Sequence, residues 1–139
     1  MTHHIPTRWI ALPAIVLAVL VVAGFVLQAE GRTVQPARIA VVVDTSRGPD
    51  PQLVERAAAT LRRTEAATGA EGQLRVTHTP TEQLSVTHYL AAKGYEAIVG
   101  VGVDTALAID PVAARYPDTH LENVAPARLD AAVHAAAAR

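Results

Sequence analysis

A run of five apolar residues, Ile39 to Val43, ends abruptly at Asp44 and constrains the fold more than any other feature. Four of the five residues are β-branched, which favours a strand. A strand that faces solvent alternates apolar and polar residues, whereas an unbroken apolar run is typical of a strand covered on both faces. We therefore predict a buried strand of a parallel sheet, with helices on both sides.

Helix signals and further strand patterns alternate after this run. Asp50 followed by Pro51 is typical of the cap and first residue of a helix. Thr79 and Glu82 have the spacing of a capping box, which opens a second helix that Gly94 would end. Further strands are expected at 74–77, 95–104 and 120–124, and further helices at 105–115, with a kink or restart at 110, and at 126–139.

Short connections between alternating strands and helices predict right-handed βαβ units and a parallel sheet. The expected fold class is α/β: a single Rossmann-like lobe whose four-stranded parallel sheet is flanked by helices. One N-terminal transmembrane helix is expected to precede this lobe.

That helix is predicted from an uncharged apolar segment of nineteen residues, Trp9 to Leu27. As a helix it would be roughly 28 Å long, close to the ~30 Å hydrocarbon core of a bilayer. The segment predicts an uncleaved signal anchor, or alternatively a signal peptide cleaved near Ala23 or Ala29. The expected organisation is a tail over 1–8, the membrane segment over 9–28, a linker over 29–37 and a soluble domain over 38–139.

Composition argues against several functional classes. The 139 residues carry a formal net charge of −1 without a basic cluster, so we expect no nucleic-acid partner. The absence of cysteine excludes disulfides, thiolate metal sites and cysteine nucleophiles. The six histidines show no metal-ligand spacing and are interpreted as surface or strand-end residues. We therefore predict a non-catalytic protein without cofactor or metal ion.

Polar residues and glycines follow the first and third predicted strands. The carboxyl ends of parallel strands meet at one edge of the sheet, where ligands of open α/β sheets bind. Asp44 is either a ligand group or a turn-former there, and Asp50 is also explained as a helix cap. The predicted ligand-binding residues are Asp44, Ser46, Asp50, Gly102 and Asp104.

The segment from Leu90 to Leu121 resembles the BMP family (basic membrane proteins). The family's motifs occur here in its order, as Gly94-Tyr95-Glu96, Ile98-Val99, Gly100-Val101-Gly102 and Tyr116-Pro117-Asp118. The resemblance covers roughly residues 38 to 121. It implies the type 1 periplasmic-binding fold of extracytoplasmic substrate-binding proteins of ABC transporters.

Many members of that family bind nucleosides between two lobes, and the resemblance implies that Asp44 and Asp50 match the two acids of the first loop. Leu53 and Val54 stand where the family has an aromatic residue and an asparagine, and Val103 where an aromatic residue often follows. The acid that would hold a ribose hydroxyl is kept, whereas the groups that stack on and read a base are missing.

The resemblance covers only the first of the family's two lobes. A single lobe leaves its strand-end cleft open to water and loses most of the ligand burial that gives affinity. A second copy, in a homodimer, or a separate partner lobe would restore that burial.

The predicted function is a membrane-anchored, extracytoplasmic, non-catalytic solute-binding-like protein, secreted if the signal is cleaved. One alternative is a structural or protein-interaction domain that has lost ligand binding. The other is a divalent-ion-dependent adhesion-type domain, because Asp44 and Ser46 are similar to the metal loop of von Willebrand factor A-type domains. Gly48 replaces the last serine of that loop.

Overall fold

Strand β1 (Arg38–Asp44) lies inside a four-stranded sheet in the computed structural model, which describes residues 35–139. The strand order is β2-β1-β3-β4, and every neighbouring pair is parallel. The other strands are β2 (Glu71–Thr77), β3 (Ala97–Val101) and β4 (His120–Val124). The predicted four-stranded parallel sheet is therefore confirmed.

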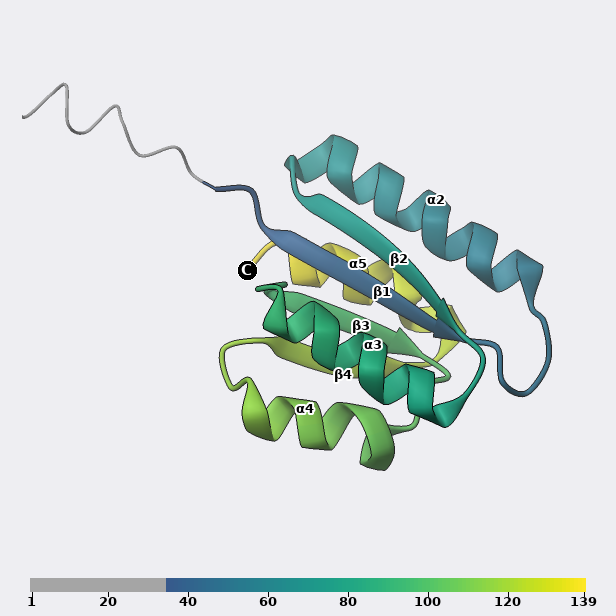
Figure 1. Ribbon diagram of the computed structural model, residues 1–139. Helices are drawn as coiled ribbons and strands as arrows, with labels where there is room; N and C mark the ends of the chain where they lie inside the picture. The colour runs from purple at the N-terminus through teal and green to yellow at the C-terminus, as the bar shows by residue number, and fades with distance from the viewer. Residues whose placement is uncertain (1–34) are drawn as a thin grey trace, which may run out of the picture. The chain divides into compact units, whose positions relative to one another are not determined.

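Helices cover both faces of the sheet (Figure 1). Helices α2 (Pro51–Thr68) and α5 (Leu129–Ala137) pack on one face. Helices α3 (Pro80–Ala92) and α4 (Asp110–Arg115) pack on the other. This three-layer arrangement confirms the predicted α/β lobe for the described residues, and residues 36–139 form one compact unit.

The apolar run of β1 supplies two separate cores. Ile39, Val41 and Val43 point into the core beneath α2 and α5, whereas Ala40 and Val42 point into the core beneath α3 and α4. All five side chains are at most 1% exposed. Successive residues of a strand face opposite sides, so a central strand covered on both sides needs an apolar residue at every position.

The helix starts follow the predicted signals with one difference. The Asp50 carboxylate accepts a hydrogen bond from the Leu53 amide at 2.9 Å and caps α2. The Thr79 hydroxyl accepts one from the Glu82 amide at 3.2 Å and caps α3. The Glu82 carboxylate was expected to return to the capping residue, but it accepts from the His78 amide at 2.7 Å instead. That acid therefore ties α3 to the end of β2.

Several boundaries differ from the sequence prediction, including the start of β3, which lies at Ala97 rather than Tyr95. Strand β2 begins at Glu71, earlier than expected, because Arg38 of β1 pairs with Glu71. Strand β3 ends at Val101, because Gly102 adopts a positive φ of 75° that turns the chain out of the sheet. A 3-10 turn, Pro126–Arg128, precedes α5.

The expected restart at Asp110 is confirmed. A π-helical turn, Thr105–Ile109, gives way to α4 at Asp110. Pro111 has no amide hydrogen and cannot continue the hydrogen-bond pattern of the preceding turn, so the helix begins again around it.

The outer side of β2 is a sheet edge. The Glu71 amide points toward β1, where it donates to the Ala37 carbonyl at 2.8 Å, so the next amide, that of Gly72, points away from the sheet. The Glu65 carboxylate of α2 accepts a hydrogen bond from this Gly72 amide at 2.8 Å. A Cβ at Gly72 would lie only 2.9 Å from Glu65 Oε1 and from Leu61 Cδ2, so a side chain there would force these two side chains to shift.

The predicted N-terminal tail, the membrane segment and most of the linker fall within residues 1–34, outside the described residues. Within residues 35–139, no helix is both long and apolar enough to cross a bilayer.

Candidate binding site at the carboxyl edge of the sheet

Strands β1 and β3 lie side by side, but the chain leaves them in opposite directions. After β1 it proceeds to α2 and β2, and after β3 it proceeds to α4 and β4. Such a reversal separates the loops that follow the two strands and opens a crevice beyond their carboxyl ends, the usual ligand position in open α/β sheets. A Cβ built on Gly102 would lie 3.5 Å from the Asp44 carbonyl oxygen and 3.7 Å from Asp44 Cβ. The candidate site is thus bounded by Asp44 and Gly102.

The Asp44 carboxylate is half-buried and surrounded by hydrogen-bond donors. The Ser46 hydroxyl donates to Oδ2 at 2.5 Å, and the Ser46 amide donates to Oδ1 at 3.3 Å. The Thr77 hydroxyl, at the end of β2, also donates to Oδ1 at 3.3 Å. These donors come from two neighbouring strand ends and fix the orientation of the acid.

Opposing effects act on the pKa of Asp44. Partial burial raises the pKa, but side-chain hydrogen bonds from Ser46, Gln83 and Thr77 and the backbone hydrogen bond from Ser46 stabilise the charged form. Their combined effect holds the pKa of Asp44 below its ordinary value of 3.8. The site therefore presents a negative charge at neutral pH.

This lowered pKa predicts that Asp44 stabilises the folded chain at neutral pH. A group whose pKa is lower in the folded state contributes stability above its unfolded-state pKa, and this contribution is lost as pH falls through the folded-state pKa. Urea unfolding of the full chain between about pH 6 and about pH 2 should show a steeper loss of stability for the wild type than for Asp44→Asn. Parallel pH profiles for the two proteins would contradict this expectation.

Gln83 of α3 links the two loops, although sequence reasoning did not select it. Its side chain is 3% exposed, and its Oε1 accepts a hydrogen bond from the Asp104 amide at 2.8 Å. The only signal for it in the sequence is its spacing, because Gln83, Thr87 and Leu90 lie on one buried helix face. An amide at a core-facing position requires polar partners, and here those partners are Asp44 and the loop after β3.

The two other predicted acids act as helix caps. The Asp104 carboxylate accepts from the Leu107 amide at 3.0 Å, at the start of the π-helical turn. Asp50 caps α2 in the same manner. Of the predicted site residues, the structure brings together Asp44, Ser46 and Gly102, joins Asp104 to them through Gln83, and places Asp50 at the border of a separate pocket.

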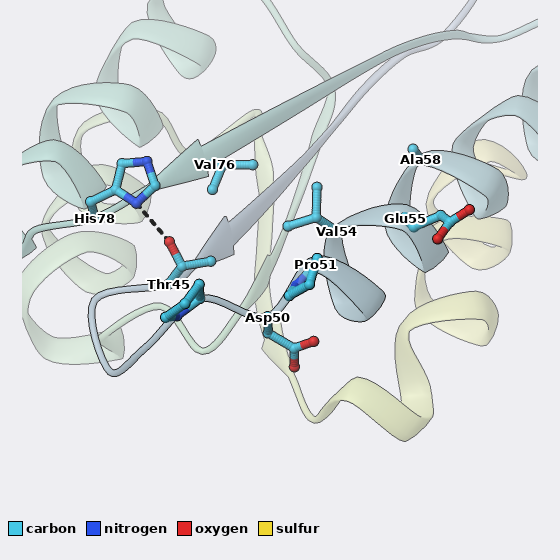
Figure 2. A pocket seen from close by; sticks show the side chains of 9 residues that line it. Thr45, Asp50, Pro51, Val54, Glu55, Ala58, Val76 and His78 are labelled. Atoms are coloured by element: carbon cyan, nitrogen blue, oxygen red, sulfur yellow. Dashed lines mark hydrogen bonds between the residues drawn. The ribbon is translucent and has the colours of Figure 1, made fainter.

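That pocket has a volume of about 530 Å³ and lies between the β1–α2 loop, the first turns of α2 and the end of β2 (Figure 2). Its lining residues are Thr45, Pro49, Asp50, Pro51, Val54, Glu55, Ala58, Val76 and His78. The Thr45 hydroxyl lies 2.7 Å from His78 Nδ1 (Figure 2). Sequence reasoning missed this pocket, because it depends on β2 being an edge strand.

Within residues 35–139, no three histidine, aspartate or glutamate side chains lie close enough to hold a metal ion together. Asp44 and Ser46 match two positions of the adhesion-type metal loop. Here their side chains bond to each other, because the Ser46 hydroxyl donates to the Asp44 carboxylate.

The strand order and the helices on both faces define a doubly wound, Rossmann-like α/β domain with one acid at the point where the connections reverse. The domain is similar to a solved fragment of a predicted lipoprotein from Peptoclostridium difficile 630, with a TM-score of 0.57 and 13% sequence identity. The match covers 69% of this chain and 90% of that chain. At this identity the similarity shows the fold alone. No protein-family model matches the chain, and no curated protein matches it.

Proposed function

We propose that this chain is a membrane-anchored, extracytoplasmic and non-catalytic domain that binds a small hydroxylated solute at the carboxyl edge of its sheet. The observation that carries the proposal is the ionised, half-buried Asp44 beside Gly102. A carboxylate is an acceptor only, so it selects ligand groups that donate, such as sugar hydroxyls. Ser46 is exposed, and its hydroxyl would exchange its bond to Asp44 for one to the solute.

The BMP resemblance supports a solute with a ribose-like group. In that family the acid at the end of the first strand belongs to the loop that contacts the ligand, and Asp44 occupies that place. Because only one lobe would contact the solute, we expect weak binding, on the order of millimolar, unless a second copy or a partner lobe covers the site.

The extracytoplasmic location rests on the apolar segment over residues 9–28. The solved neighbour is described as a lipoprotein, which supports a place outside the cytoplasm for the fold. This chain contains no cysteine to carry a lipid, so the apolar segment would supply the anchor.

The contacts of Thr45 hold the β1–α2 loop against the end of β2. The Thr45 amide donates to the Thr77 carbonyl at 2.8 Å, and the Thr45 hydroxyl lies 3.1 Å from the same oxygen and 2.7 Å from His78 Nδ1. The histidine tautomer sets the direction of the last hydrogen bond. In either direction the pair supports the loop that carries the binding site.

The proposal predicts that ribose-containing solutes stabilise the full chain through Asp44. In thermal unfolding of the detergent-solubilised protein, ribose or uridine at tens of millimolar should raise Tm by a few degrees. The same increase is expected for Asp118→Asn, because Asp118 is an exposed acid before β4, at the opposite edge of the sheet. It should vanish in Asp44→Asn.

Two results would overturn this assignment. Stabilisation by Mg²⁺ alone, lost in Asp44→Asn, would favour the adhesion-type alternative. Absence of any shift with ribose, uridine or Mg²⁺ would favour a structural or protein-interaction domain.

A further inference from the structure

We propose that the pocket beside β2 is a second binding site, for a small molecule with an apolar ring and a positively charged amine. We call it the β2-edge pocket, defined by the nine lining residues given above. It is distinct from the Asp44 site, because Asp44, Ser46, Gly102 and Asp104 do not line it. Its volume of about 530 Å³ falls within the range of about 300 to 1,000 Å³ usual for small-molecule sites.

The apolar body of the ligand follows from the walls of the pocket. Val76 is on β2, the edge strand of the sheet that residues 35–139 form, and it faces α2 on the same side of β2 as Leu74. Opposite it, α2 presents Val54 and Ala58, whose short side chains leave a hollow. An apolar ring placed there would remove these partly buried surfaces from water.

The prolines of the β1–α2 loop make the remaining wall stiff. Pro49 and Pro51 both line the pocket, and their fixed φ angles limit the movement of the loop. The hydrogen bond between Thr45 and His78 joins this loop to the end of β2. The pocket is therefore largely formed before a ligand arrives, which reduces the entropy lost on binding.

The positive charge of the ligand follows from the polar groups at the border. Asp50 and Glu55 line the pocket, whereas no lysine or arginine is among its lining residues. One oxygen of Asp50 caps α2, and Glu55 is exposed. In Figure 2 the His78 imidazole and the Glu55 carboxylate lie on opposite sides of Val54. A ligand with its ring near His78 and its ammonium group near Glu55 would span this distance with complementary charge.

The test compares two probes of similar shape and opposite charge, tryptamine and indole-3-propionate. Methyl NMR spectra of the full chain in nanodiscs report on the pocket directly, through Val54, Ala58 and Val76. We expect tryptamine to shift these methyl signals and to bind about fivefold more tightly than indole-3-propionate. This affinity ratio corresponds to the free energy of one exposed ion pair. Glu55→Gln, a change at an exposed position, should abolish most of this preference without affecting folding.

A variant that fills the pocket provides a second test. Ala58→Trp should occupy the hollow and weaken tryptamine binding at least tenfold, whereas Ala66→Trp, at an exposed position of the same helix, should leave binding unchanged. Unperturbed pocket methyls at saturating tryptamine, or equal affinity for the two probes, would overturn the proposal. So would a concentration-dependent dimer that shifts the Val54 and Val76 signals without ligand, because a second copy would then be the occupant.

Discussion

Ile98→Ala is expected to lower the free energy of unfolding by about 3 kcal/mol. Ile98 is the second residue of β3 and is completely buried in the core beneath α3 and α4. The substitution deletes the side-chain atoms beyond Cβ. The fold loses the free energy of transferring these apolar groups from water into the core, and a cavity remains that the neighbouring strands cannot close. Because folded domains are stable by only about 5 to 15 kcal/mol, this single change removes a large fraction of the total.

Urea denaturation of the full chain, with the m-value compared between proteins, measures this loss. Leu107→Ala is the matched control, since Leu107 is 53% exposed and belongs to the π-helical turn. The control should change the free energy of unfolding by less than about 0.5 kcal/mol. Similar losses for the two variants would mean that Ile98 does not occupy the core described here.

Gln83→Met is expected to cost about 2 kcal/mol and to raise the pKa of Asp44. Methionine has a similar length but cannot accept the hydrogen bond from the Asp104 amide, so a partly buried donor loses its partner. It also cannot donate to Asp44, so the charged form of that acid loses part of its stabilisation. The expected signature is therefore a destabilised fold together with a shifted titration.

The titration distinguishes this role from simple packing. Carboxyl NMR signals of the full chain, followed with pH, should show Asp44 titrating at higher pH in Gln83→Met than in the wild type. Gln52→Met places the same change at an exposed position of α2 and should alter neither quantity. An unchanged Asp44 titration in Gln83→Met would limit Gln83 to a role in the core.

The strands and helices could be predicted because their signals are local. The β1 run, the Asp50-Pro51 helix start, the Gly94 stop and the restart at Asp110 each depend on residues within a few positions of one another. One of the boundaries that moved depends on a partner far away in the sequence. The start of β2 at Glu71 follows from its register against Arg38, a pairing that no local pattern reveals.

The residues of the candidate site also fall into those that the sequence could place and those that it could not. Asp44 and Gly102 could be placed at one edge because parallel strands bring their ends together. Gln83 and the Thr45–His78 pair could not, because their roles depend on the direction of single side chains toward loops 21 and 33 residues away. The β2-edge pocket was also beyond prediction, because it requires the order of the strands and the small size of Ala58 at the same place.

The hydrogen bond from the Gly72 amide to Glu65 bears on how copies of this protein behave when they crowd together. An open strand edge invites sideways addition of another chain, the step that begins fibrillar aggregation. Here the Glu65 carboxylate accepts the hydrogen bond of one outward-facing amide and places a negative charge beside the β2 edge. A second strand that pairs with this edge would have to displace the carboxylate and would lie next to its charge. This acid therefore disfavours the addition of a second chain at the β2 edge.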